Sequence, residues 1–340
     1  MAAHFGLDLG SFSIKVIKAN KEAGKYRLES FGEILTPASI TSEVEKDKIS
    51  LAEAIKKLLK DANIKATQAT LALPEAYAYS QIISLPYLSQ SELASAIKFE
   101  AEQYIPIPLK EVHLEYQILK APSPEAKNEK MEILLVAAKK TAIEKILAIT
   151  KLANIEPTSL ETETLAMIRA LSSSTGDFRL IINFGKNSTS ICLVKGDDLR
   201  FVRTLNAGGE VITRAIANEL NMDPMQAERY KITYGLLQDQ LEGKVAAIIS
   251  SVFANTLNEI KQCLIFFSRQ YPGSILKSVI LSGGMALMPG LTSHLAKELN
   301  LEVRAADPFS NFIKDANFPK VLLSIYSKFS TAVGLAIREV

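Results

Sequence analysis

Tryptophan is absent from this 340-residue chain, cysteine occurs twice and histidine occurs three times. Cys192 and Cys263 each stand inside an apolar run, where a buried small hydrophobic residue is expected. The histidines His4, His113 and His294 are scattered singly, with no cysteine or carboxylate at ligand spacing. A structural metal site, and zinc in particular, is therefore not expected.

An excess of charge of one sign and a long apolar run are also missing. The 39 Lys and Arg residues are interspersed with 37 Asp and Glu residues, and the formal net charge of +2 leaves no electrostatic footprint for nucleic acid. No apolar run approaches the roughly 18 residues of a membrane-spanning helix, and the N-terminus does not have the pattern of a signal peptide. We expect a cytoplasmic protein with no nucleic-acid partner and no direct membrane insertion.

The first motif that is present is a glycine turn between two apolar segments, within Phe5 to Lys15. The turn consists of Gly10, Ser11, Phe12 and Ser13. Backbone amides of such a turn can meet phosphate oxygens, and Asp8, two residues before the glycine, would face magnesium. Lys15 could add a point charge. An ordinary hairpin turn has the same pattern, so this motif alone leaves both interpretations open.

The same pattern returns in the middle of the chain, between Ile182 and Ser190. In this alignment Asp8 corresponds to Asn183, Gly10 to Gly185 and Ser13 to Ser188, with Lys186 and Asn187 inside the second turn. Two such hairpins in the two halves of one chain indicate a duplicated pair of domains that clamps a nucleotide between them.

A third stretch, Val279 to Ala286, is an apolar strand that leads into Gly283, Gly284 and Met285. The missing side chains of the two glycines let the backbone approach a flat adenine or its phosphates. In this order, the three stretches resemble the actin, sugar-kinase and heat-shock-chaperone ATPase superfamily. The resemblance implies an α/β, actin-like (ribonuclease H-like) duplicated two-lobe fold that binds ATP and Mg²⁺, with Asp8 as the metal residue.

The resemblance also implies further nucleotide contacts in the second lobe. Gly208 and Gly209 precede a helix there, and Glu228 and Lys231 have the spacing at which actin-like chaperones place a glutamate and a lysine against adenosine. A surface ion pair, which would contribute only about 0.3 to 0.5 kcal/mol, explains the last two residues equally well.

A different segment identifies the family within this superfamily. The stretch Ile97 to Pro108, followed by Val112 to Leu119, resembles the small inserted α+β subdomain of the PilM family of type IV pilus assembly proteins. The division protein FtsA has a similarly placed insertion, but its family ends in a membrane-binding helix, which Ala336 to Val340 does not resemble. The PilM resemblance covers nearly the whole chain.

The PilM resemblance implies a partner and a location. The groove between insertion and first lobe would take the N-terminal cytoplasmic tail of a PilN-like inner-membrane protein, and we expect Tyr104, Ile105 and Ile107 near it. The protein would then be peripheral at the inner membrane through its partner. Contacts with other pilus assembly components are also implied, and self-association is left open.

The expected division of the chain follows from these assignments, since 48% hydrophobic content over 340 residues can bury more than one core. We expect a first-lobe core at 1–86, the inserted subdomain at 87–156, a return and interlobe connection at 157–177, a second-lobe core at 178–210, a helical subdomain at 211–274, and more second-lobe core at 275–340.

Hydrolysis is less well supported than binding. At Asn183 the superfamily usually has aspartate, and an amide can neither take a proton nor supply charge to magnesium, so weak or absent ATPase activity is expected. Glu161 and Glu163 stand near the interlobe connection, but glutamates that begin a helix are ordinarily dipole partners, and we assign neither as a catalytic base. Three function classes follow: a nucleotide-responsive pilus assembly protein, an FtsA-like division protein, and a metabolite kinase.

Overall fold

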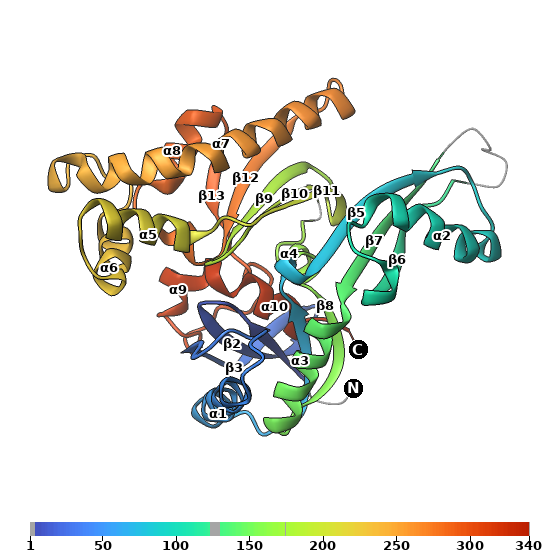
Figure 1. The fold of residues 1–340 in the computed structure, drawn as a ribbon, viewed down its shortest axis with the longest axis horizontal. Helices are drawn as coiled ribbons and strands as arrows, with labels where there is room; N and C mark the ends of the chain where they lie inside the picture. Colours follow the sequence, from blue (N-terminus) through green and yellow to red (C-terminus); the bar gives the residue numbers. More distant parts are fainter. Residues whose placement is uncertain (1–3, 123–129, 174, 340) are drawn as a thin grey trace.

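Three β-sheets organise the chain, for which a computed structural model describes residues 4–122, 130–173 and 175–339 (Figure 1). The first sheet has the order β3-β2-β1-β4-β8. Its strands are β1 (Phe5–Leu9), β2 (Ser13–Glu22), β3 (Lys25–Leu35), β4 (Gln68–Leu73) and β8 (Glu156–Thr162). β1 and β2 form an antiparallel hairpin, and β4 and β8 add in parallel. The sheet packs against α1 (Glu45–Asp61) and α3 (Lys140–Leu152) in one apolar core.

The second sheet repeats this arrangement with the order β11-β10-β9-β12-β13. Its strands are β9 (Phe178–Phe184), β10 (Thr189–Lys195), β11 (Asp198–Leu205), β12 (Leu276–Ser282) and β13 (Val303–Ala305). The helices of this half are α5 (Gly209–Glu219), α6 (Pro224–Tyr234), α7 (Lys244–Gln270) and α8 (Leu291–Leu299). Again an antiparallel hairpin is extended by parallel strands. The predicted duplicated α/β fold is therefore confirmed.

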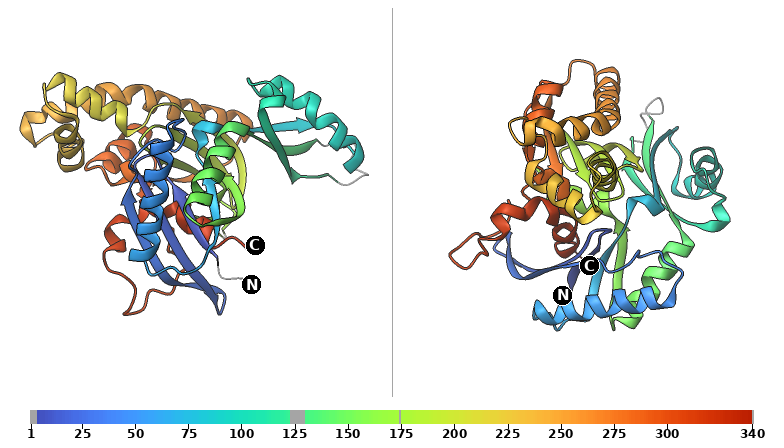
Figure 2. Two further views of the ribbon diagram at one scale, coloured as in Figure 1. Left: turned by 60° about the horizontal axis from the view of Figure 1, so that its bottom comes forward. Right: turned by 60° about the vertical axis from the view of Figure 1, so that its left-hand side comes forward.

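The third sheet, with the order β5-β7-β6, projects from the body together with α2 (Figures 1 and 2). Its elements are β5 (Ala78–Leu85), α2 (Gln90–Tyr104), β6 (Val112–Lys120) and β7 (Met131–Lys139). Ser89 caps α2 reciprocally with Glu92, because each side chain accepts from the other residue's backbone amide. The unit has its own apolar core.

Two contacts favour different limits for this inserted unit than the expected 87–156. β5 pairs with β7 along its whole length, so the inserted sheet already begins at Ala78. α3, in contrast, packs on α1, because Ile146 and Ile149 belong to the core of the first sheet. We therefore propose that the inserted unit covers 78–139, and we keep the expected interlobe limits near 157–177 and 211–274 as proposals.

The end of the chain returns to the first sheet. Phe309, Phe312 and Phe329 pack against side chains of β2 and β3, although we expected 275–340 to lie in the second lobe. The last helix, α10 (Ser330–Ala336), crosses α4 (Glu163–Ala170) so closely that a Cβ on Gly334 would lie 1.7 Å from the Ala166 carbonyl oxygen. A short helix, α9 (Leu322–Ile325), precedes this crossing.

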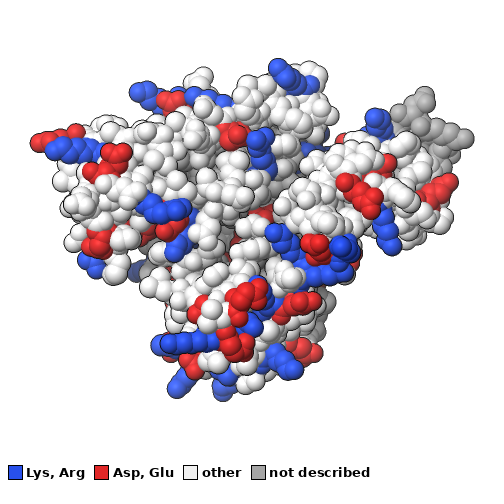
Figure 3. All heavy atoms as spheres, in the orientation of Figure 1, with Lys and Arg blue, Asp and Glu red and all other residues white. Residues whose placement is uncertain are grey.

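The surface in Figure 3 shows Lys and Arg intermixed with Asp and Glu, without a continuous field of one sign on this face. Among the described residues, none of the helices combines the length and the apolar character needed to cross a bilayer.

Candidate functional site

A cleft of about 250 Å³ lies where the two hairpin turns and the end of β12 meet. Sixteen of the eighteen residues expected to bind nucleotide line it: Asp8, Gly10, Ser11, Phe12, Ser13, Lys15, Asn183, Gly185, Lys186, Asn187, Ser188, Glu228, Lys231, Gly283, Gly284 and Met285. The other two, Gly208 and Gly209, are not among its lining residues, because they pack behind the second hairpin. The tertiary structure thus brings four stretches from both halves of the chain to one place.

The first hairpin holds a buried charge pair at the cleft. Asp8 and Lys15 are opposite each other in the β1–β2 register, and the Lys15 ammonium lies 3.3 Å from the Asp8 carboxylate and 3.2 Å from the Ser13 carbonyl oxygen. The turn needs glycine, since a Cβ on Gly10 would lie 2.7 Å from that same carbonyl oxygen. The Lys15 ammonium and the Asp8 carboxylate are therefore held side by side next to a turn in which Gly10 has no side chain.

The second hairpin meets the end of β12 just as closely. Gly185 donates its amide to the Ser188 carbonyl at 2.9 Å, which closes the turn. Gly283 has φ +84°, and a Cβ there would lie 2.3 Å from the Phe184 carbonyl oxygen and 2.8 Å from the Asn183 amide oxygen. Both the backbone conformation and the space therefore require glycine at this position.

The wall formed by α5 and α6 contains a buried lysine. The Lys231 ammonium contacts the Glu228 carboxylate at 2.7 Å, the Thr213 hydroxyl at 2.8 Å and the Gly209 carbonyl oxygen at 3.1 Å. Lys231 is only 6% exposed, so the surface ion pair that we held open does not describe it. The α5 N-terminus is held to the second turn, because Gly209 donates its amide to the Gly185 carbonyl oxygen at 3.0 Å.

Two carboxyl groups that we did not assign to the site stand at the start of α4. Glu163 lines the cleft, and Glu75, in the turn after β4, is 2% exposed and accepts the Thr164 amide at 2.9 Å. Burial, together with the charges of Asp8 and Glu75, raises the pKa of Glu163 to about 8. Burial also raises the pKa of Glu75, against the hydrogen bonds from Thr164. The only sequence signal for Glu75 is its place after the proline that stops β4.

Glu161, in contrast, does not face the cleft. It lies on β8 and accepts two hydrogen bonds from Arg169, at 2.6 and 2.7 Å, and one from Arg338 at 2.7 Å. The two glutamates point to different sides of the first lobe, because β8 ends at Thr162 and α4 begins at Glu163, so the backbone changes direction between them.

A second pair that the sequence did not indicate also lines the cleft. The Lys328 ammonium lies 2.5 Å from the Glu33 carboxylate, and the Ser13 hydroxyl donates to the same carboxylate at 2.7 Å. Burial raises the pKa of Glu33, but the hydrogen bonds from Lys328 and Ser13 and the charges of Lys328 and Lys15 outweigh it and lower the pKa overall. No local motif marks either residue, because Glu33 lies on β3 and Lys328 lies near the end of the chain.

The donor set of the cleft suits a metal that is shared with a phosphate better than a protein-only metal site. No group of three or more His, Cys, Asp or Glu side chains among the described residues could hold a metal ion. Mg²⁺ usually takes one or two carboxylates and completes its shell with water and substrate phosphates. Asp8 in a glycine-lined cleft fits that pattern.

A larger groove of about 1300 Å³ lies between the inserted sheet and the first lobe. Parts of β6, β7, α3, β8 and α4 line it, together with residues near the C-terminus. β6 and β8 each end their sheet, so the outer backbone groups of both strands face no further strand of the described chain. Tyr104, Ile105 and Ile107, which we expected near this groove, do not line it, because α2 packs on the far side of the inserted sheet.

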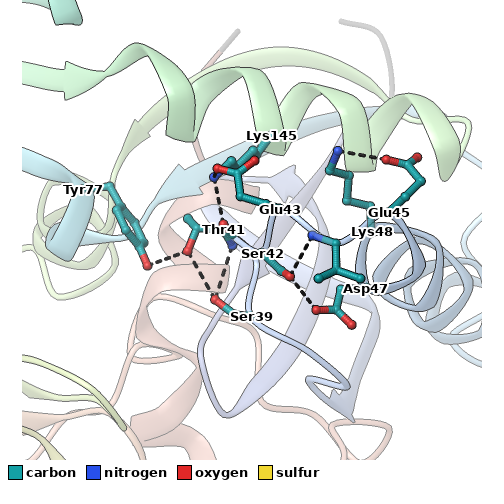
Figure 4. A network of polar contacts seen from close by, with 10 residues as sticks. Ser39, Thr41, Ser42, Glu43, Glu45, Asp47, Lys48, Tyr77 and Lys145 are labelled. Carbon is teal, nitrogen blue, oxygen red and sulfur yellow. Dashed lines mark hydrogen bonds and ion pairs between the residues drawn. The ribbon is translucent and has the colours of Figure 1, made fainter.

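A polar network connects the loop before α1 with Tyr77 and with Lys145 on α3 (Figure 4). The Tyr77 hydroxyl, at the cleft, lies 2.9 Å from the Thr41 hydroxyl. Lys145 on α3 donates to the Thr41 carbonyl oxygen at 2.8 Å and pairs with Glu43. The loop before α1 therefore links α3 to the turn after β4.

Comparison with known proteins relates the whole chain to one family. The family model described as type IV pilus assembly protein PilM matches residues 6–340. A solved structure described as the PilM-PilN type IV pilus biogenesis complex is 27% identical, with 99% of this chain and 98% of that chain covered and a TM-score of 0.87.

Two more distant matches have lower sequence identity. The cell division protein FtsA of Streptococcus pneumoniae serotype 2 is 24% identical over 60% of this chain and 49% of its own length, so the chain spans about half the length of the curated relatives it matches. MreB5 of Spiroplasma citri bound to ADP is 12% identical, covers 98% of this chain and 95% of its own, and has a TM-score of 0.55, which indicates a shared fold only. With the family match over residues 6–340, this chain belongs to the PilM family of type IV pilus assembly proteins.

Proposed function

We propose that this chain is a cytoplasmic, nucleotide-binding component of the type IV pilus assembly platform that docks the N-terminal tail of a PilN-like inner-membrane protein. The observation that carries the proposal is the meeting of both hairpin turns and the β12 turn at one glycine-lined cleft, beside a separate groove. The similarity to the PilM-PilN complex supports the partner, and similarity in fold to MreB5 bound to ADP supports the nucleotide.

In this proposal different residues of the cleft contact different parts of the nucleotide. Backbone amides of the turns at Gly10 and Gly185 would meet phosphate oxygens, and Asp8 would hold Mg²⁺ through water. Lys15, now 3.3 Å from Asp8, would turn its charge to the phosphates. Gly283 and the wall around Lys231 would leave room for the adenosine.

The same cleft is poorly equipped for hydrolysis. Asn183 can supply no charge and accept no proton. Glu163 is the nearest alternative, but its pKa of about 8 leaves it mostly protonated at neutral pH. We therefore propose that nucleotide is held much longer than it is turned over.

The groove is suited to an extended segment. Two sheet edges, β6 and β8, border it, and apolar side chains such as Leu165 and Ile168 on α4 lie between them. An extended tail gains backbone hydrogen bonds at a sheet edge and specificity from pockets for alternate side chains. Such a tail would hold the protein at the inner membrane.

Nucleotide binding is tested by the melting temperature with and without magnesium and ATP. At a hundredfold excess over Kd, ligand binding adds about 2.7 kcal/mol to stability, so the protein should melt several degrees higher. Asp8→Ala should lose most of this shift, whereas the matched control Asp239→Ala, an exposed acid, should keep it. An unchanged melting temperature of the unmodified protein at millimolar magnesium-ATP would remove the nucleotide from the proposal.

Tail docking is tested with a peptide copying the N-terminal tail of the membrane protein that co-purifies from native membranes. Leu147, which is 45% exposed and lines the groove, can be changed without disturbing the core. Leu147→Arg should weaken peptide binding, whereas Leu323→Arg, which is 51% exposed and outside the groove, should not. Equal binding by both variants would place the tail elsewhere.

A further inference from the structure

The groove has an unusual balance of charge for this protein. Its acidic, basic and histidine lining residues are Glu115, Glu144, Glu161, Asp197, Glu339, Lys140, Arg169, Arg338 and His113. With His113 neutral, five carboxylates face three cations, a net charge of −2, whereas the whole chain has a net charge of +2. The groove is thus more acidic than the protein around it.

The cations of the groove are already engaged within the protein. Arg169 forms a bidentate pair with Glu161 at 2.6 and 2.7 Å and also donates to the Gly334 carbonyl oxygen at 2.8 Å. Arg338 donates to the same Glu161 carboxylate at 2.7 Å. Lys140 donates to the Lys110 carbonyl oxygen at 2.8 Å. Because both arginines are paired with the same Glu161 carboxylate, they are poorly placed to meet an incoming anion, and Lys140 is left as the one cation of the lining described here without a carboxylate partner.

Two of the five carboxylates, in contrast, remain open to a ligand. Glu144 on α3 is exposed and forms no ion pair with another described residue. Glu115 on β6 has a side chain 71% exposed, and its ion-pair partner is His113, 2.9 Å away, which carries charge only when it is protonated. These two acids stand on the two walls of the groove, one on the inserted sheet and one on the first lobe.

We propose that the groove selects a basic extended segment, in which Lys or Arg side chains flank apolar ones. The apolar residues would lie between the β6 and β8 edges, and the cations would meet Glu115 and Glu144. This inference rests on the docking function proposed above and specifies the chemical character of the segment that docks. Cytoplasmic segments next to a membrane span carry an excess of Lys and Arg, so the tail of a single-span protein is the occupant that this charge pattern fits.

The test uses the full chain and three synthetic peptides of about ten residues. All share one apolar centre of alternating leucine and isoleucine, flanked by lysines, by glutamines or by glutamates, and each has a fluorescent label for anisotropy. The lysine peptide should bind about tenfold more tightly than the glutamate peptide, with the glutamine peptide between them. Raising sodium chloride from about 50 to about 500 mM should reduce that preference, because salt screens exposed charges.

Charge-reversal variants then show which carboxylates cause the preference for the lysine peptide. Glu144→Lys and Glu115→Lys should each weaken binding of the lysine peptide about three- to tenfold and leave the glutamine peptide nearly unchanged. Glu219→Lys, an exposed acid on α5 that lies outside the groove, makes the same change in net charge and should have no effect. Melting curves of all three variants check that they are folded.

The outcomes separate this inference from the docking proposal. Equal binding of the three peptides, or an equal loss in Glu219→Lys, would overturn the charge preference while docking stands. Binding of the lysine peptide that Leu147→Arg does not weaken would show attraction to a different surface and overturn it as well. Failure of all three peptides to bind the folded chain would overturn docking and charge preference together.

Discussion

Glu163 offers a quantitative test of the cleft, because its pKa of about 8 predicts how stability depends on pH. Below the ordinary value of 4.5, the folded and unfolded states both hold the proton and the group contributes no pH dependence. Between 4.5 and about 8 only the folded state holds it, so the free energy of unfolding falls as the pH rises. Above about 8 the loss is complete.

The expected size follows from the same values. At 1.36 kcal/mol for each tenfold change in proton affinity, a rise from 4.5 to about 8 corresponds to roughly 5 kcal/mol. The residue keeps some access to solvent, which screens the charge, so we expect a loss of about 2 to 4 kcal/mol. Glu163→Gln removes this titration and keeps the shape of the side chain. The stability of the variant relative to the unmodified protein should therefore rise between pH 6 and pH 8 and level off by pH 9.

The measurement is chemical unfolding followed by circular dichroism, since the chain has no tryptophan to report by fluorescence. Unfolding midpoints at pH 6, 7, 8 and 9 are compared for the unmodified protein, for Glu163→Gln and for the exposed control Glu219→Gln. The control should follow the unmodified protein at every pH. Parallel curves for Glu163→Gln would mean that Glu163 is already ionised in the folded protein, which would refute the reasoning.

Three further predictions concern the cleft and the crossing of α4 and α10. Asn183→Asp should speed the turnover of ATP or make nucleotide binding more dependent on magnesium, as measured by phosphate release; rapid turnover by the unmodified protein would show that the amide is no handicap. Lys231→Met should reduce the melting shift caused by magnesium-ATP, because it leaves the Glu228 carboxylate without its cation at 2.7 Å; a full shift would exclude this wall from the site. Gly334→Ala should destabilise the fold by about 3 kcal/mol or more, since the added Cβ would lie 1.7 Å from the Ala166 carbonyl oxygen; a melting temperature within a degree of the unmodified protein would contradict that crossing.

Much of the candidate site could be predicted from the sequence because its key residues belong to short local motifs. A glycine turn after an apolar strand requires specific residues within a few positions, and such a turn occurs at Gly10 and again at Gly185. The double glycine at the end of β12 is marked in the same way, and the structure explains it by a φ of +84° at Gly283. Sixteen of the eighteen expected residues line one cleft for this reason.

The sequence by itself also determined the two-lobe class of fold, because the repeated hairpin is visible as a repeated pattern. Only the tertiary structure decided which residues from distant segments share a site. Glu33 and Lys328 form an ion pair at the cleft, and Glu75 accepts the Thr164 amide at the start of α4, next to Glu163. No local sequence pattern predicts either contact. Burial and neighbouring charge, which raise the pKa of Glu163, exist only once the chain is folded.

The limits of the inserted unit and the lining of the groove were likewise decided by packing. The alternating residues of β5 would suit a place in the first sheet as well as in the inserted sheet. The apolar face of α3 could likewise have packed on the first lobe or on the inserted unit. The end of the chain joins the first sheet because Phe309 and Phe329 complete its core, a contact between segments some three hundred residues apart. Local patterns specify strands and turns, whereas long-range burial chooses their partners, and it was that choice which placed the groove between β6 and β8.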